Sequence, residues 1–349
     1  MTQPIVLNEE NVSDYIINDI DILKKGGEIT EVTEIKKYTN SGYVFKISLE
    51  NYPHKTIFLK QSRDRTKNDF ELPAERVCWE AESIIKFNEI LEEKIAPEVI
   101  FLDKDNNVLI MEDISVGGEF FIDLFKQERL KASDAKMCAE MFGKLHGRTY
   151  GMKEHNFGEN DEWYIFLTDF VFREYDLIGF KKFFNEKDVD KILDESVNAT
   201  QSFCHVDPYL KNIYFHKDKM RIVDFEQATK WDPAYDIGSF LTPWAIVLLS
   251  DNSKLKEECR KFITDFIEIY QSILIENGVS KDDLPEIIYR ALRYTATTIL
   301  HHTWGSGNSD FMMSYKDKVK IEIINLLENR KSSFTQEIRK LYGVEKNLL

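Results

Sequence analysis

Cysteine is scarce in this chain, and its few positions form no recognisable pattern. The 349 residues include four cysteines with no C-x-x-C spacing among them: Cys78, Cys138, Cys204 and Cys259. Zinc clusters and secreted disulfide scaffolds both need closely or regularly spaced cysteines, so neither is indicated. We expect four buried, reduced thiols.

Long apolar runs are also missing. No stretch of 18 consecutive residues is apolar, and the N-terminal sequence MTQPIVLNEENVSDYI has neither the basic start nor the apolar core of a signal peptide. We therefore expect no membrane-spanning segment and a cytoplasmic location.

Positive charge is in deficit. The formal net charge is -15 at pH 7, whereas nucleic acids and anionic membranes attract net or clustered basic surfaces. We expect neither partner, and any phosphate site must be local.

The remaining composition, 43% hydrophobic and 31% charged, is typical of a globular protein, and the length suffices for two lobes with a cleft between them. The sequence gives no indication of an oligomeric state.

The first third of the chain predicts a sheet with helices beside it. Apolar residues at helical spacing indicate a helix over residues 9–25 and a second, inserted helix over residues 72–91. Alternating or β-branched stretches between turn signals predict five strands, at residues 30–37, 43–49, 56–60, 98–102 and 108–111. We read the first three as antiparallel.

Beyond Glu112 the pattern becomes mainly helical, with helices predicted at residues 132–150, within residues 161–184, and in three or more segments between residues 254 and 340. One block differs. Two short apolar runs at residues 212–215 and 220–223 flank a polar turn and predict a hairpin with polar residues at both ends.

That hairpin follows a motif suited to phosphoryl transfer. The sequence His205-Val206-Asp207-Pro208-Tyr209-Leu210-Lys211-Asn212 is followed, after the hairpin, by Ile222-Val223-Asp224. Phosphoryl transfer needs a carboxylate beside the acceptor hydroxyl and oxygen ligands for a magnesium ion. We predict that Asp207 is the catalytic base and that Asn212 and Asp224 bind Mg2+.

These motifs resemble the aminoglycoside phosphotransferase and choline kinase superfamily, whose members are relatives of the protein kinases. The segment Asp232-Pro233-Ala234-Tyr235-Asp236 is similar to a D-P-x-x-D segment of that family, whose second aspartate supports the catalytic loop. The helix that ends in Leu145-His146 is similar to the family's L-x-x-L-H helix. The resemblance implies an α+β, bilobal, protein-kinase-like fold, with a five-stranded antiparallel sheet and one helix in the N-lobe and a mainly helical C-lobe.

The same resemblance implies a nucleotide site and the cofactors ATP and Mg2+. Lys60 stands where the family has the lysine that contacts the α- and β-phosphates, and either Glu80 or Glu82 on the inserted helix is its expected partner, with Glu82 preferred. The turn that contains Ser41 and Gly42 is expected to cover the phosphates. Backbone groups are expected to hydrogen-bond adenine in a hinge formed by Glu112, Asp113 and Ile114. The implied division is a nucleotide-binding lobe at residues 1–111, a hinge at 112–118, and a lobe at 119–349 with the catalytic loop and acceptor site.

The acceptor is expected to be a hydroxyl group on a small molecule. Eight positions separate Asp224 from Asp232, too few for the peptide-docking segment of protein kinases. An acidic chain favours a cationic acceptor, such as an amino alcohol or an aminoglycoside. We expect the acceptor pocket to include late helical residues: Arg290, Arg293, His301 and Trp304.

Two alternatives remain open. The segments Leu59-Lys60-Gln61 and Ala96-Pro97-Glu98-Val99 resemble those of methylthioribose kinase. This resemblance implies a sugar kinase, in which Arg290 and Arg293 would contact the sugar. A nucleotide-binding pseudokinase or regulatory protein is the alternative from another class, although such proteins ordinarily lose the loop aspartate, the metal aspartate or the strand lysine, and this chain has all three.

Overall fold

The computed structural model describes residues 5–19, 27–35, 42–65, 71–129, 131–152, 166–199, 201–216, 219–249, 253–305, 313 and 315–348. The chain forms two compact units. The first consists of Met1–Glu119 and Tyr214–Glu226, and the second of Phe120–Ile213 and Gln227–Leu349. The late segment Tyr214–Glu226 thus joins the N-terminal residues. The roles given to residues 1–111, 112–118 and 119–349 stay predictions.

The first unit is built on a five-stranded antiparallel sheet in the order β1-β2-β3-β5-β4. Its strands are β1 (Glu28–Glu34), β2 (Gly42–Glu50), β3 (Thr56–Ser62), β4 (Val99–Asp103) and β5 (Val108–Glu112). Each lies within three residues of its predicted position, so the five-stranded prediction is confirmed.

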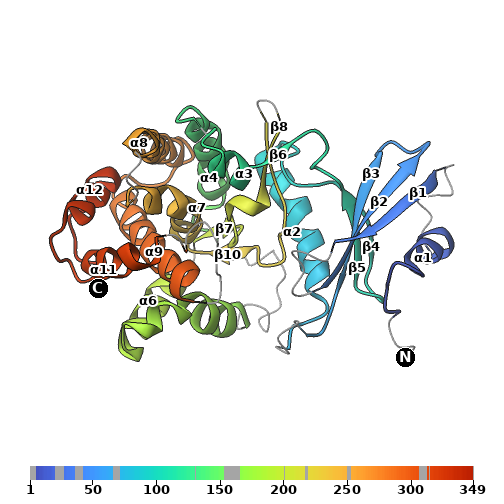
Figure 1. Cartoon of the computed structure of the whole chain (residues 1–349), viewed down its shortest axis with the longest axis horizontal. Coiled ribbons are helices and arrows are strands. Elements are labelled where there is room, and N and C mark those ends of the chain that lie inside the picture. The colour runs from blue at the N-terminus through green and yellow to red at the C-terminus, as the bar shows by residue number, and fades with distance from the viewer. Residues whose placement is uncertain are drawn as a thin grey trace. The chain divides into compact units, whose positions relative to one another are not determined.

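Two helices cover this sheet, and Figure 1 shows them on opposite faces. Helix α1 (Val12–Asp19) places Val12 and Ile16 in a core with alternate apolar residues of β2, β3 and β5. Helix α2 (Arg76–Leu91) lies on the other face. It begins at Arg76, four residues later than predicted; Pro73 accounts for the non-helical backbone of Leu72 before it. Residues 20–25 of the predicted first helix lie outside the described residues.

The predicted hairpin is confirmed as β8 (Ile213–His216) and β9 (Lys219–Ile222), which form a three-stranded sheet with β6 (Glu119–Phe120) in the order β6-β8-β9. The backbone N–H of Ile222 donates to the carbonyl of Ile95 at 3.2 Å. This bond helps to fasten the late segment into the first unit.

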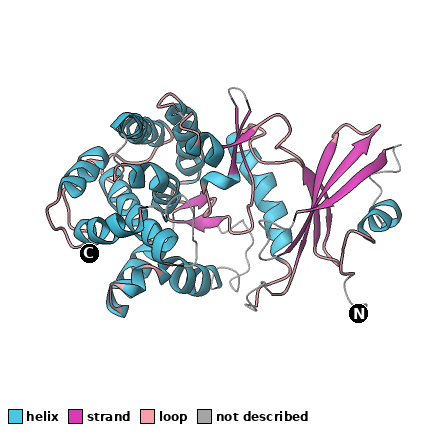
Figure 2. Cartoon of the chain, in the orientation of Figure 1, coloured by secondary structure: helices cyan, strands magenta, loops and turns pink. Residues whose placement is uncertain are grey.

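The second unit is mainly helical, as the cyan ribbons of Figure 2 show. Its first elements are α3 (Phe121–Lys126), α4 (Asp134–Thr149), the π-helix η2 (Leu167–Tyr175), the short 3-10 helices η3 (Asp176–Ile178) and η4 (Phe180–Lys182), and α6 (Glu186–Asn198). The strands β7 (Ser202–Cys204) and β10 (Thr229–Trp231) pair antiparallel, and the 3-10 helix η5 (Leu210–Asn212) lies between them in the sequence. The later helices are α7 (Pro233–Val247), α8 (Ser253–Glu276), α9 (Leu284–Trp304), α11 (Lys316–Leu327) and α12 (Ser333–Tyr342).

Helix α7 is the centre of this unit, since every one of its residues is buried. Asp232 precedes the helix as its N-cap, and its side chain accepts a hydrogen bond from the N–H of Ala234 at 3.0 Å. Despite its apolar character, neither α7 nor another described helix combines the length and composition that crossing a bilayer requires.

Candidate active site

Lys60 lies in a cluster of charged side chains in the first unit. Alternate residues of a strand face opposite sides of the sheet. Leu59 is in the core under α1, so Lys60 faces the α2 side. Its Nζ lies 2.8 Å from Glu80, 3.0 Å from Asp224 and 3.1 Å from Glu226. A strand, a helix and the segment after β9 therefore converge on one ammonium group.

This cluster holds an excess of negative charge. Burial lowers the pKa of Lys60, but the three carboxylate charges outweigh burial and hold that pKa well above its ordinary value. Burial raises the pKa of Glu80 to about 7, because the opposing charge of Lys60 is shared with two other carboxylates. Arg76, which is fully buried, adds a second positive charge 3.5 Å from Glu226. Two cations thus face three carboxylates, an environment that favours a further cation.

The partner of Lys60 on α2 is Glu80, so the preference for Glu82 was wrong. Glu80 is 1% exposed and follows Val77 by three residues and precedes Ile84 by four, so all three lie on one buried helical face. Glu82 points elsewhere, and the cation near it is Lys104 at 4.0 Å. The apolar spacing around Glu80 was the sequence signal that could have decided between them.

Asp224 is held within the first unit by its neighbours in sequence. The ring of Phe225 packs edge-on against Phe87 of α2, with 4.9 Å between ring centroids. The backbone of Asp224 has a φ of 71°, in the left-handed region that side chains other than glycine rarely adopt. Such strained backbone is maintained where the surrounding structure fixes it, and it is common at functional sites.

Asp207 and Asn212 form a hydrogen-bonded pair in the second unit. The Nδ2 of Asn212 donates to both the backbone carbonyl and Oδ2 of Asp207, each at 2.9 Å. Asn212 is 5% exposed at the end of η5, while Asp207 is half-buried. The amide nitrogen therefore orients the carboxylate, and the amide oxygen of Asn212 is the atom that could ligate a metal ion.

The start of this loop is supported by Asp236, one turn into α7. Its Oδ2 accepts from the N–H of His205 and its Oδ1 from the N–H of Val206, both at 2.8 Å. The ring of His146 contacts Asp236 at 3.1 Å through Nε2 and Tyr270 at 2.9 Å through Nδ1. The support that the resemblance implied for Asp236 is present, and it holds Val206 at a φ of 69°.

His146, Cys204 and Asp236 lie close enough together to suggest a metal site, but their chemistry argues against one. All three are buried, with potential ligand atoms within 4.8 Å of one another. Burial raises the pKa of the Cys204 thiol well above its ordinary value, so the thiolate that a metal needs is disfavoured. The carboxylate of Asp236 already accepts two backbone N–H groups. The cluster is a structural support for the loop.

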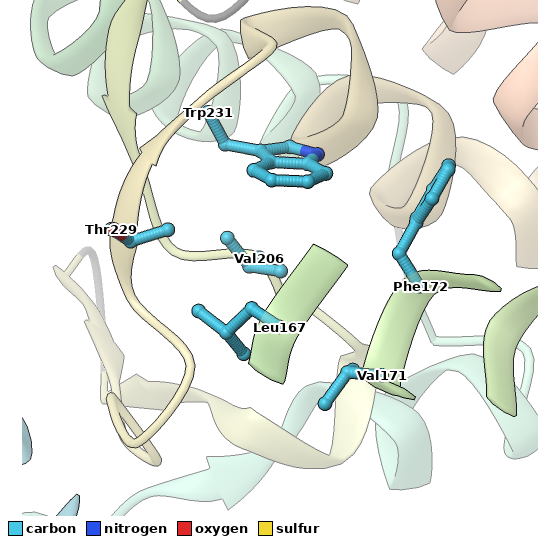
Figure 3. Close-up of a pocket in the computed structure, with 6 residues that line it drawn as sticks. All are labelled: Leu167, Val171, Phe172, Val206, Thr229 and Trp231. Carbon is cyan, nitrogen blue, oxygen red and sulfur yellow. The ribbon is translucent and has the colours of Figure 1, made fainter. Parts of the chain in front are cut away.

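A small apolar cavity adjoins the same loop, and Figure 3 shows the indole of Trp231 above the side chain of Val206. The ring centroids of Phe172 and Trp231 are 5.7 Å apart. The residues that line the cavity are Leu167, Val171, Phe172, Val206, Thr229 and Trp231. With a volume of about 10 Å³, the cavity has room for one water molecule at most. It is a gap in the packing and too small for an acceptor.

The side chains of the predicted hinge point into the first unit. The carboxylate of Asp113 contacts Lys46 at 2.8 Å and the hydroxyl of Thr56 at 2.7 Å, and accepts from the N–H of Ser115 at 2.8 Å. Burial raises the pKa of Asp113, but these hydrogen bonds lower it below its ordinary value. Ile114 is 7% exposed. Adenine binding would thus fall to the backbone groups here, and it stays a prediction.

The phosphate-covering turn is described only at its end. Ser41 lies outside the described residues, and Gly42 opens β2. A Cβ atom at Gly42 would lie 2.5 Å from the backbone oxygen of Gln61 on β3. Glycine is therefore required by the close approach of two strands, and its role toward phosphate stays a prediction.

The two arginines expected near the acceptor are engaged in internal ion pairs. Arg290 donates from Nε to Asp232 at 2.7 Å and from Nη2 at 3.1 Å. Arg293 is fully buried and pairs with Glu195. His302, near the end of the same helix, stacks on Tyr209 with 4.7 Å between ring centroids. The end of α9 therefore adjoins the Asp207 loop through aromatic rings, while both arginines stabilise the unit.

Residues 137–251 match the family described as the phosphotransferase enzyme family. This stretch contains Asp207, Asn212, Asp224 and Asp236. No curated protein matches the chain at a significant level.

Solved structures share the architecture of the chain. The crystal structure of a choline/ethanolamine kinase family protein from Mesorhizobium loti is 16% identical, with a TM-score of 0.52 over 96% of this chain and 99% of that chain. The choline kinase from Cryptosporidium parvum is 17% identical, with a TM-score of 0.53 over 96% of this chain and 94% of that chain. At these identities the likeness establishes the fold. The chain therefore has the protein-kinase-like fold of the choline kinases, and its residues 137–251 carry the sequence pattern of the phosphotransferase enzyme family.

Proposed function

We propose that this protein is an ATP-dependent kinase that transfers the γ-phosphate to a hydroxyl group of a small molecule. The observation that carries the proposal is the convergence on Lys60 of Glu80 from α2 and Asp224 from the segment after β9, at 2.8 and 3.0 Å. In kinases, the nucleotide site combines a strand lysine that is paired with a helix glutamate and an aspartate that binds the metal ion.

The residues fit Mg2+-ATP in the nature of their donor atoms. The carboxylate excess around Lys60 suits a divalent cation, and oxygen ligands are those that magnesium prefers. In this proposal Lys60 binds phosphate oxygens, while Asp224 and Asn212 hold the metal ion, which would neutralise charge on the transferred phosphate. Asp207, oriented by the amide of Asn212, receives the proton of the acceptor hydroxyl.

The acceptor we place first is an amino alcohol. The two similar structures described above are a choline/ethanolamine kinase family protein and a choline kinase, and an acidic protein favours a cationic substrate. A methylthioribose-type sugar kinase would need arginines for its substrate, but Arg290 and Arg293 are already paired with Asp232 and Glu195. Aminoglycosides and pentose sugars therefore follow amino alcohols in a screen.

Calorimetry tests nucleotide binding, and an ATP-consumption screen tests transfer. We expect saturable binding of a non-hydrolysable ATP analogue that tightens with Mg2+, and turnover with at least one hydroxylated small molecule. No binding at millimolar nucleotide would refute the proposal and leave a different function for this fold. Binding without turnover of any acceptor would favour the pseudokinase alternative, and transfer to protein alone would overturn the choice of a small acceptor.

A further inference from the structure

Arg221 makes a set of contacts that none of the proposed catalytic roles requires. It lies in β9, three residues before Asp224. Its guanidinium donates from Nε to the carbonyl of Ile95 at 3.0 Å and from Nη2 to the carbonyl of Ala96 at 3.2 Å. The same group binds the carboxylate of Glu112 through Nη2 at 2.8 Å and Nη1 at 3.3 Å.

These contacts join parts of the first unit that are far apart in the sequence. Ile95 and Ala96 lie between α2 and β4, and Glu112 ends β5, more than a hundred residues before Arg221. The Arg221 side chain is 17% exposed and that of Glu112 is 21% exposed, so water screens the pair only in part. A fork that binds one carboxylate through Nη1 and Nη2, and two carbonyls through Nε and Nη2, fixes both distance and direction, which a lysine could not do.

The position of Asp224 depends on the chain that leads to it. On one side stand Arg221 and the backbone bond from Ile222 to Ile95, and on the other Phe225 packs on Phe87. Asp224 itself has the strained φ of 71°. A short segment of strained backbone keeps its geometry when both of its ends are anchored, so loosening one end would allow the Asp224 carboxylate to move.

We propose that Arg221 is a positioning residue that sets the place of the Asp224 carboxylate beside Lys60, and that it thereby controls how strongly a divalent cation enhances nucleotide binding. This inference rests on the proposed function. Residues that orient a metal ligand without touching the metal change metal affinity about 10- to 100-fold when they are removed.

The test compares Arg221→Met and Arg221→Lys with the unaltered protein. For each protein, calorimetry gives the dissociation constant of a non-hydrolysable ATP analogue with and without Mg2+, and the ratio of the two constants measures the metal enhancement. We expect Arg221→Met to reduce this ratio about tenfold or more while the constant without Mg2+ stays within about twofold. Arg221→Lys keeps the charge without the fork, so we expect an intermediate ratio.

Arg260→Met is the matched control, because Arg260 also binds a carboxylate, Glu337 at 2.5 Å, on helices of the second unit. Its metal enhancement should equal that of the unaltered protein. An unchanged ratio in Arg221→Met, or equal weakening with and without Mg2+, would overturn the proposal, because Arg221 would then act only through the fold or through the Glu112 segment that it also binds. If Arg221→Met does not fold, the Arg221→Lys ratio decides in the same way. If the unaltered protein binds no nucleotide, the proposed function fails first, and that outcome is distinct from the others.

Discussion

Lys60 shares its single positive charge among Glu80, Asp224 and Glu226. The result is a pair, Lys60 and Glu80, in which the pKa of both members is raised. Lysine stays protonated under this influence, whereas Glu80, with a pKa of about 7, titrates near neutrality. The nucleotide-free cluster is therefore sensitive to pH within the physiological range.

A substitution at Glu80 tests this sensitivity. The pKa of Glu80 rises from 4.5 to about 7 on folding, so its contribution to stability is present below pH 4.5 and is lost as pH rises through 7. The quantity to compare is the difference in the free energy of unfolding between the unaltered protein and Glu80→Gln. We expect this difference to fall by roughly 3 kcal/mol as the pH rises from 4.5 to 7. Urea unfolding at several pH values measures the difference. A difference that is flat or rises with pH would contradict the cause assigned to the shift.

Asp207 and Asp224 should separate binding from transfer. Asp224→Ala removes the carboxylate beside Lys60, so we expect the Mg2+-dependent part of nucleotide binding to vanish. Asp207→Asn keeps the size of the side chain and should leave nucleotide binding within about twofold, while transfer falls about 10²- to 10⁴-fold, the usual contribution of a general base. Calorimetry and an ATP-consumption assay on both variants provide the comparison. Equal loss of nucleotide affinity in the two would mean that these roles are assigned wrongly.

The sequence predicted the types of residue in the site better than their partners. Lys60 could be placed on its strand because alternation and β-branched residues mark strands clearly. Its partner depended on the rotation of α2, and the choice of Glu82 ignored that Val77 and Ile84 place Glu80 on the buried face. The internal pairs of Arg290 and Arg293 involve residues 58 and 98 positions away, and no local pattern reveals contacts of that separation.

At the scale of elements, α7 and α9 approach each other closely at Gly238. A Cβ atom there would lie 2.5 Å from the Cβ of Tyr294, 2.7 Å from the carbonyl of Ala291 and 2.9 Å from the N–H of Thr295. Backbone cannot move aside as a flexible side chain can. The helix that begins at Asp232 and holds Asp236 is thus packed directly against the helix that carries Arg290.

Gly238→Ala should separate these two helices. We expect it to lower the free energy of unfolding by about 1–3 kcal/mol, the usual cost of overpacking, as measured by urea unfolding. The matched control is Gly147→Ala in α4, where the added atom would meet only the side chain of Asn277, at 2.7 Å. The atom at 2.7 Å is the Cβ of Asn277, and the other near atoms belong to the same side chain, with no backbone among them. The control should therefore cost less, and equal losses would contradict the importance of backbone contact.

Asp236→Asn tests how α7 supports the loop that contains His205, Val206 and Asp207. An amide has one acceptor oxygen where the carboxylate has two, so either His205 N–H or Val206 N–H loses its partner. We expect a loss of about 1–3 kcal/mol in the free energy of unfolding, because the orphaned N–H is buried. Asp265→Asn, which breaks the pair of a partly buried aspartate with the exposed Lys261 on α8, should change stability far less than Asp236→Asn, because water screens such a pair.

The elements themselves were largely predictable, and their grouping was not. Five strands, the inserted helix and the hairpin follow from local periodicity and turn residues. The membership of Tyr214–Glu226 in the first unit depends on contacts between segments that are distant in the sequence. The hairpin was predicted as part of the C-lobe region because sequence order alone suggested it.

At the scale of the whole molecule, ligand binding should appear as increased thermal stability. A ligand at 100 times its dissociation constant adds about 2.7 kcal/mol to the folded state, which corresponds to a rise of a few degrees in the unfolding temperature of a protein this large. We expect Mg2+-ATP to produce a larger rise than ATP alone. Scanning calorimetry with both ligands measures the difference, and Asp224→Ala, which lacks the proposed metal aspartate, should abolish it.

The inclusion of Tyr214–Glu226 in the first unit has a consequence for synthesis on the ribosome. The sheet and α2 emerge early, but Arg221 and Asp224 arrive roughly a hundred residues later, which takes about 5–20 s at usual rates of translation. Until then Lys60 and Glu80 face each other without the carboxylates of Asp224 and Glu226. The first unit therefore cannot be completed in N-to-C order, and a nascent chain that stops before Phe225 lacks the ring that packs on Phe87 and helps to hold the proposed metal aspartate, Asp224.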